Sequence, residues 1–366
     1  MSQNLDILPA GGGAVELLEQ ADEDRRFEET VSDKNDTVVD SFAESVRPDF
    51  VYKQLPCITR RENHLFRHFI DGSVQTYVLG TGIEQNRNFP IVLAQIGAAA
   101  LKREDDGRMV KAYSESKILM LLPFNKMSEQ TLRNITQVVE QTTDGAIELV
   151  DTSSADVDLG TADEAQDPTS RATGIAKSRM RAIEREIAVT VGENSDTNFI
   201  VDGTIRSGSF GWGQSVPKKT VAISKSFTQR PKFEVFGRGE VEMKNLPRLL
   251  SGLKYEHRTP AFFTSQGKVI FWYLRMRHQG QVDYPLMGVI KVEAPAENPN
   301  EKLATETIDL ISSCLLAERT VSPYGNDVRW HAHIYPVFVT EEYIKHMFYT
   351  RDVFKGMIRW PKIELA

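Results

Sequence analysis

The sequence predicts one α/β domain built on a mixed sheet flanked by helices, with an N-terminal arm and an internal insertion. Three observations predict this class. The 366 residues are more than twice the roughly 150 residues of a common domain, which leaves room for a large core and insertions. Runs of β-branched and aromatic residues alternate with segments of helical periodicity. No repeat of solenoid length is present.

The composition is that of a soluble protein. Hydrophobic residues make up 40% of the chain and charged residues 26%. No apolar segment approaches the ~18 residues needed to cross a bilayer, and no basic patch followed by an apolar run marks a secretory leader. Two cysteines are too few for a disulfide framework or a CxxC-type zinc site. We therefore expect a cytoplasmic protein that does not contact a membrane.

The charges are unevenly distributed along the chain. Residues 1–47 carry twelve acidic residues against four basic ones, and Val15, Leu17 and Leu18 follow a short helical pattern. We interpret residues 1–48 as an acidic, partly helical, mobile arm. From Pro217 to Arg277 the balance reverses, with thirteen Lys or Arg against four Glu. Such a segment suits a phosphate backbone, although solvated faces of strands and loops explain it equally well.

The first half of the main domain, which we place at residues 49–350, reads mostly as strands. Strands are expected over 65–79, where an Asp-Gly corner separates two of them, over 89–94 and over 116–122. Ser128 is expected to cap a helix that ends near Thr142. The acidic stretch 151–167 reads as a surface loop, and we assign residues 100–165 to an insertion.

The second half alternates further helices and strands. Helices are predicted over 169–191 and 301–318, and strands over 198–204, 220–224, 232–236, 269–277 and 286–292. Residues 331–339 are expected to form a strand. It would lead into a helix over 340–348 that Thr340 caps, before a C-terminal tail of residues 351–366.

Two apolar segments end in the same local design, Asp-Gly followed by Ser or Thr. They place Asp71 before Gly72 and Asp202 before Gly203. An aspartate at the end of a buried strand directs a carboxylate from a rigid sheet toward a cleft, and the glycine permits close approach. An ordinary Asp-Gly turn is the simpler reading of either motif alone.

A third acid strengthens the functional reading. Glu184 lies on the helix before the second Asp-Gly strand, beside apolar residues at helical spacing. Glu186 competes for this role but lies about 200° around the helix. Three carboxylates from two strands and a helix suit Mg²⁺ or Mn²⁺. Such a site activates water and stabilises the leaving oxygen of a phosphodiester.

Several basic and aromatic residues are candidate contacts to nucleic acid. Lys225 follows a predicted strand and is placed to meet a phosphate or developing charge. Arg275 and Arg277 share a strand face that suits a DNA backbone, with ion pairing as the alternative. Trp272 and Tyr273 either stack on bases or belong to the core. The sequence has no P-loop, no dinucleotide fingerprint and no GxSxG elbow, so any ATP-driven motion must come from a partner.

Taken in order, short motifs across residues 65–350 resemble those of the NurA-type nucleases. Residues 71–73 resemble the family's first Asp-Gly-Ser motif, and residues 183–184 resemble its helix glutamate. Residues 202–204 resemble its second Asp-Gly-Ser motif. Later motifs of the family resemble 221–226, 271–275, 292–295 and the Tyr335–Pro336 pair.

The resemblance implies an RNase H-like fold and a homodimeric exonuclease that prefers Mn²⁺. It further implies work beside a HerA-type hexameric ATPase. Asp71, Glu184 and Asp202 would hold the metal, and Tyr335 and Lys225 would join the catalytic group. The family has a histidine eight residues after the tyrosine, where this chain has Tyr343. Of the neighbouring histidines 331, 333 and 346, we assign His333 as the additional ligand.

We therefore expect a divalent-metal-dependent DNA nuclease that acts in DNA end processing or in defence against invading DNA. A catalytically weak DNA-binding or assembly subunit that regulates the ATPase is the alternative. Another RNase H-like enzyme, of the Piwi or Holliday-junction type, is a third reading. The Trp-Tyr-Leu-Arg strand weighs against that last class.

Overall fold

The computed structural model describes most of the chain. The described residues are 5–6, 13–16, 38–39, 42–59, 65–84, 87–153, 167–205, 216–225, 232–237, 240–264, 267–278, 287–321 and 330–359. No helix in these segments is long and apolar enough to cross a membrane.

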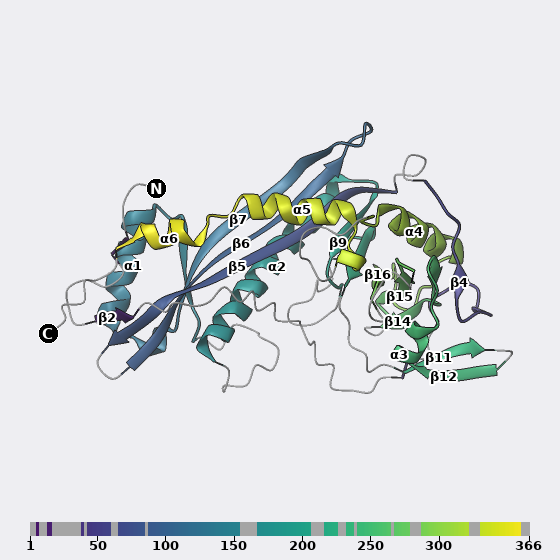
Figure 1. Ribbon diagram of the computed structural model, residues 1–366, viewed down its shortest axis with the longest axis horizontal. Helices are drawn as coiled ribbons and strands as arrows, with labels where there is room; N and C mark the ends of the chain where they lie inside the picture. The colour runs from purple at the N-terminus through teal and green to yellow at the C-terminus, as the bar shows by residue number, and fades with distance from the viewer. Residues whose placement is uncertain are drawn as a thin grey trace.

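The architecture is α/β, with one large mixed sheet flanked by helices, as expected (Figure 1). The helices are α1 (Glu129–Thr143), α2 (Pro168–Asn194), α3 (Leu246–Ser251), α4 (Thr305–Glu318), α5 (Tyr335–His346) and α6 (Arg351–Met357). The sheet has twelve strands. Those at its centre are β5 (Phe66–Glu84), β6 (Arg87–Arg103), β7 (Met109–Leu122), β9 (Asn198–Asp202), β10 (Thr220–Ser224), β15 (Val269–Arg275) and β16 (Val289–Pro295).

The remaining strands lie at the edges or in small sheets. In the large sheet they are β2 (Gly13–Glu16), β4 (Lys53–Gln54), β8 (Ile147–Asp151), β13 (His257–Arg258) and β14 (Phe262–Thr264). Outside it are β1 (Leu5–Asp6), β3 (Val38–Val39), β11 (Lys232–Gly237), β12 (Glu240–Asn245) and β17 (Ile358–Arg359). Residues 13–16 pair with β5, so this part of the expected helical arm is extended.

The main path of the sheet runs β4-β13-β15-β16-β10-β9-β5-β6-β7-β8. Strands β5, β9 and β10 are parallel to one another, whereas β5, β6 and β7 form an antiparallel ribbon. Figure 1 shows this ribbon as the longest feature of the molecule. Residues 100–122 and 147–151 of the expected insertion contribute to strands of the main sheet. Of the surface loop expected over 151–167, residues 154–166 lie outside the described residues.

The two faces of the sheet are covered by different helices. Phe69, Ile200 and Ile223 pack in one cluster with Val337 of α5 and with residues of α4. Their neighbours Ile70 and Val201 pack in a second cluster with α2. Because successive strand residues point to opposite faces, α5 and α2 cover opposite sides of the same strands.

The expected corner at Asp71-Gly72 was wrong, because β5 runs unbroken through both residues. Gly72 pairs in register with Ala98 of β6. A Cβ at Gly72 would lie 2.0 Å from Sδ of Met180, so the glycine lets α2 pack closely on the strand. Here the glycine permits a close helix contact and makes no turn.

The end of the chain also differs from expectation. Helix α5 begins at Tyr335, in a segment that we had expected to form a strand, and Pro336 occupies its first turn. Proline suits this position because its missing N–H has no helical partner there. Thr340 is therefore inside the helix, where its hydroxyl donates to the carbonyl oxygen of Pro336 at 2.9 Å. Helix α6 occupies part of the expected tail.

Other predictions are confirmed. Helix α1 begins after Ser128, whose side chain accepts a hydrogen bond from the N–H of Thr131 at 3.2 Å. Helix α2 and strands β9 and β10 lie where they were expected.

Candidate active site

Asp71 and Asp202 lie at the same level of two neighbouring parallel strands. Ile70 of β5 pairs with Val201 of β9, so the two aspartates occupy the next position on each strand. Both share the strand face of Phe69 and Ile200, which is the face covered by α5. Adjacent strands lie about 4.8 Å apart. The fold thus brings together the two Asp-Gly motifs that the sequence singled out.

Asp71 is a buried acid. It is 5% exposed, and its Oδ1 accepts a hydrogen bond from the N–H of Gly72 at 2.7 Å. Its Oδ2 is buried and has no hydrogen-bond partner in the structure. Burial raises the pKa of Asp71 well above its usual value. A buried carboxylate oxygen of this kind is costly unless a cation or a proton compensates it.

Lys225 supplies a resident positive charge. It follows β10, and its Nζ donates to Oδ2 of Asp202 at 2.7 Å. The side chain of Lys225 is 5% exposed, whereas that of Asp202 is 21% exposed. Burial alone would lower the pKa of Lys225, but the charges of Asp202 and Asp71 and the hydrogen bond raise it above its usual value. Lys225 is therefore charged at neutral pH.

Gly203 shapes the chain just after Asp202. Its φ of +120° lies where residues with a Cβ are strained. Its N–H donates to the carbonyl oxygen of Ile223 at 2.8 Å, and its carbonyl oxygen accepts from the hydroxyl of Ser224 at 2.8 Å. These bonds fix the end of β9 against β10, and with it the position of Asp202 opposite Lys225.

Helix α5 contributes a carboxylate that the sequence analysis missed. The charge of Glu341 raises the pKa of both Asp71 and Lys225. Thr340, its neighbour, donates to the carbonyl oxygen of Phe69 at 3.3 Å and so joins α5 to β5 two residues before Asp71. Glu341 lay inside the helix expected over 340–348, but no motif in the sequence marked it as a site residue.

Glu184 approaches from the other side of the sheet. It is 9% exposed on α2, whereas Glu186 is exposed, so Glu184 is the acid of this pair that faces the protein. Burial raises the pKa of Glu184 to about 8, and the charge of Asp202 adds to the rise, while Arg181 and Arg185 oppose it. Glu184 therefore interacts with the aspartates electrostatically, from the helix on the α2 face.

The carboxylates of the candidate site are too far apart to bind one metal ion as a group of three. No group of three His, Cys, Asp or Glu placed to hold a metal ion occurs among the described residues. The separation of Glu184 from the aspartates by the sheet explains part of this. The donor chemistry still suits Mg²⁺ or Mn²⁺, because Asp71 and Asp202 offer oxygen atoms and one of these is an unpartnered, buried Oδ2.

The two histidines near the start of α5 lie in the protein interior. His333 is 1% exposed, and its ring lies 5.9 Å from that of Phe338. Nδ1 of His331 accepts a hydrogen bond from the N–H of Gly288 at 2.8 Å. Tyr335, at the first turn of α5, is 38% exposed.

The two arginines expected to bind DNA are buried. Arg275 is 0% exposed and donates to the carbonyl oxygens of Leu250, Leu253 and Met287. Arg277 lies with its guanidinium 4.9 Å from the ring centre of Trp330 and is 6% exposed. This placement gives both a structural role, and the expected contact with a DNA backbone does not fit it.

The aromatic pair beside them belongs to the core as well. Trp272 is 0% exposed, and its Nε1 donates to Oγ of Ser312 at 2.9 Å. Tyr273 is 2% exposed. Of the two readings that the sequence left open for these rings, the core reading holds.

No protein-family model matches the sequence, and no curated protein matches it.

Proposed function

We propose that this protein is a divalent-metal-dependent nuclease that hydrolyses DNA phosphodiester bonds, acting from DNA ends. The observation that carries the proposal is the placement of Asp71 and Asp202 at one level of two parallel strands. A second carboxylate so close to a buried one is unfavourable without a compensating cation. Pairs of carboxylates on rigid strands are a common way to hold hard metal ions.

Asp71 and Asp202 would hold Mn²⁺ or Mg²⁺, with Glu341 on the same face and Glu184 on the opposite face adding negative charge. When bound, the metal supplies an activated water and stabilises the leaving oxygen. Lys225 neutralises charge at the site and is positioned beside Asp202 to stabilise a phosphate. We retain Tyr335 and His333 as proposed site residues from the motif resemblance alone.

The similarity to the NurA-type nucleases extends this proposal to partners. The motifs at residues 71–73, 183–184 and 202–204 support it, since they fall on β5, α2 and β9 in the expected order. A mixed sheet with helices on both faces is compatible with an RNase H-like fold. The proposed setting is a cytoplasmic homodimer beside a HerA-type hexameric ATPase, acting in DNA end processing or defence.

One observation favours a second candidate, a catalytically weak assembly subunit that binds DNA and regulates such an ATPase. The Lys225 ammonium already occupies one carboxylate oxygen of Asp202. It thereby compensates part of the charge that a metal would otherwise neutralise. This arrangement would preserve the fold of the site without turnover.

A nuclease assay separates the two candidates. End-labelled linear DNA and closed circular DNA would be incubated with EDTA, Mg²⁺ or Mn²⁺, with and without a HerA-type ATPase. Asp71→Asn and Asp202→Asn keep the side-chain shape but remove the charge. Asp196→Asn is the matched control, because Asp196 is fully exposed in the turn before β9.

Metal-dependent loss of linear DNA that disappears in both site variants and persists in the control is the expected result. Failure of the wild type to cleave under every condition, with DNA or ATPase binding intact, would overturn the enzyme and favour the assembly subunit. Cleavage that survives both site variants would overturn the assignment of the aspartates.

A further inference from the structure

The chain crosses from one face of the sheet to the other directly after Asp202. Asp202 is the last residue of β9 and lies on the face covered by α5. Gly203 follows with its φ of +120°, and Ile205 already packs in the cluster on the α2 face. The position of the Asp202 carboxylate therefore depends on what holds the backbone of residues 203–205.

A buried carboxylate on β16 holds this turn. Glu293 is 0% exposed, and its Oε2 accepts a hydrogen bond from the N–H of Ile205 at 2.7 Å. Ile205 is 1% exposed, so loss of this acceptor would leave a buried N–H without a partner. A hydrogen bond to a carboxylate is also stronger than one between neutral groups. The backbone after Asp202 is thus tied to β16, which lies beyond β10 in the sheet.

The register of three strands explains how Glu293 reaches the turn. Ala222 of β10 pairs with Val201 on one side and with Glu293 on the other. The three residues therefore point to the same face of the sheet. This is the α2 face, because Val201 and Ala222 pack in the α2 cluster. Glu293 thus acts on the backbone behind Asp202, from the face opposite to its carboxylate.

Lys291 compensates the charge of Glu293. Its Nζ donates to Oε1 of Glu293 at 2.5 Å and lies 4.6 Å from the ring centre of Phe271. Residues two apart on a strand share a face, so the pair forms within β16 itself. One oxygen of Glu293 is thereby bound to Lys291, and the other accepts from Ile205. Glu293 belongs to the motif at residues 292–295, to which the proposed function assigns no role.

We propose that Glu293 is a positioning residue for the candidate site. Through the N–H of Ile205 it fixes the chain after Asp202. It thereby keeps the Asp202 carboxylate within reach of Lys225 and at the level of Asp71. The inference deepens the proposed function and rests on it only in taking a metal ion as the ligand of Asp202.

Two double variants test this role at equal buried charge. Lys291→Met with Glu293→Gln, the Gln background, removes the ion pair but keeps a side-chain oxygen for the N–H of Ile205. Lys291→Met with Glu293→Leu, the Leu background, removes both the ion pair and the acceptor. Apolar side chains of similar volume often replace a buried ion pair without loss of stability. The two backgrounds therefore differ in the acceptor alone.

The first readout needs no metal. In each background, urea unfolding in EDTA would be measured for Lys225→Met, Asp202→Asn and the variant with both changes, which gives the coupling between Lys225 and Asp202. The coupling should persist in the Gln background and fall by at least half in the Leu background. Glu293→Asp keeps the charge on a shorter side chain and should also lose coupling. It replaces the Leu background if that protein does not fold.

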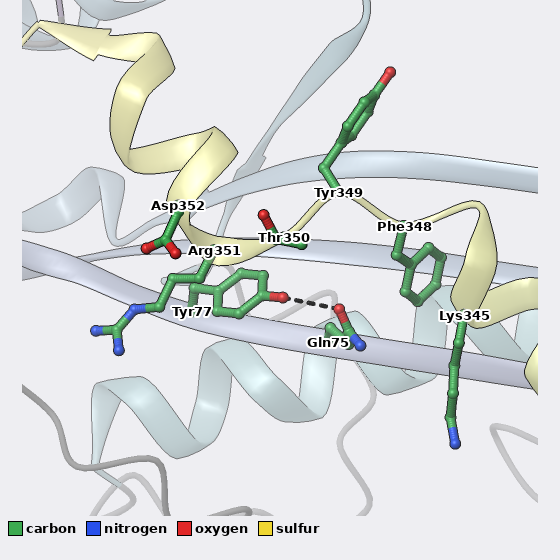
Figure 2. Close-up of a pocket in the computed structure, with 8 residues that line it drawn as sticks. All are labelled: Gln75, Tyr77, Lys345, Phe348, Tyr349, Thr350, Arg351 and Asp352. Atoms are coloured by element: carbon green, nitrogen blue, oxygen red, sulfur yellow. Dashed lines mark hydrogen bonds between the residues drawn. The ribbon is translucent and has the colours of Figure 1, made fainter.

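The second readout is Mn²⁺ binding without DNA, followed by the EPR signal of the free ion. The Leu background should bind Mn²⁺ about tenfold more weakly than the Gln background, since loss of one buried hydrogen bond has an effect of this size. Tyr77→Phe is the matched control. It removes the hydrogen bond of 2.8 Å from Tyr77 to Gln75, elsewhere on β5 (Figure 2), and should bind Mn²⁺ like the wild type.

Equal coupling between Lys225 and Asp202 in the two backgrounds would overturn the positioning role, whether or not Mn²⁺ binds. Equal and measurable Mn²⁺ affinity in the two backgrounds would overturn it as well. A wild type that binds no Mn²⁺ but whose coupling still depends on the acceptor would support the role of Glu293 and contradict the metal site. The failure of this inference and the failure of the nuclease proposal are therefore distinguishable.

Discussion

The ammonium of Lys225 lies 2.7 Å from Oδ2 of Asp202. Asp202 ends β9, and Lys225 directly follows β10, the parallel strand beside it. Asp71 stands at the level of Asp202 on the next strand. The positive charge of Lys225 thus acts on both carboxylates. This arrangement makes the stability of the protein sensitive to each charge at the site.

Replacing Lys225 with Met should destabilise the protein by about 3 kcal/mol, because it leaves buried carboxylates without their cation. Urea unfolding in EDTA at pH 7 measures the change. Lys219→Met is the matched control. The ion pair of Lys219 with Asp196 is at the surface, so that loss should stay below about 1 kcal/mol. Equal losses for the two variants would show that Lys225 does not compensate buried charge.

Glu184 should make the protein less stable as the pH rises from about 4.5 to about 8. Its pKa is raised by burial to about 8 in the folded state, so the folded protein binds a proton that the unfolded chain has already released. Glu184→Gln should reduce this slope, leaving the contribution of Asp71, whose pKa burial also raises, and should increase the melting temperature at pH 8. Glu186→Gln, at an exposed position of the same helix, should leave the slope unchanged. A Glu184→Gln profile that keeps the slope would contradict the assignment.

Glu44 should be important for holding the N-terminal segment to the C-terminal half. It is 0% exposed and accepts hydrogen bonds from the guanidinium of Arg258, the N–H of Ala261 and the hydroxyl of Thr305. Glu44→Gln should lower the free energy of unfolding by about 3 kcal/mol, since Arg258 loses part of its buried partner set. Chemical denaturation tests this. Glu129→Gln, which breaks an exposed pair, is expected to change it by less than about 1 kcal/mol.

Gly72→Ala should lower stability by about 1–2 kcal/mol, because the new methyl group meets Met180 of α2. Thermal unfolding measures the loss. The double variant Gly72→Ala with Met180→Ala makes room for the methyl group. The loss of stability in the double variant should therefore be smaller than the sum of the losses in the two single variants. Strict additivity would mean that the close packing of α2 on β5 is not the reason for the glycine.

The sequence was informative wherever the signal was local. Helix α1 begins after Ser128 because the cap and the periodicity belong to the same few residues. Strand β9 was recognisable from its continuous apolar run. The proximity of Asp71 and Asp202 was inferred from two copies of one motif, and the parallel pairing of β5 with β9 agrees with it.

The errors arose where tertiary contacts override a local pattern. Asp-Gly is a strong turn signal, yet Gly72 is extended because Met180 packs against it and Ala98 pairs with it. Arg275 looked like a phosphate contact in a strand, but carbonyl oxygens from α3 and the following loop surround its guanidinium. Glu341 was missed because its role depends on how α5 crosses β5, and no short motif encodes that crossing.

The order in which the central strands are made has a consequence for folding during synthesis. Strands β5, β6 and β7 are consecutive and pair locally, so this ribbon can form early. The partner on the other side of β5 is β9, which is synthesised about 130 residues after the part of β5 with which it pairs. Until then the edge of β5 that carries Asp71 is open to pairing with other chains. A nascent chain stalled before β9 should therefore depend on chaperones more than the finished protein does.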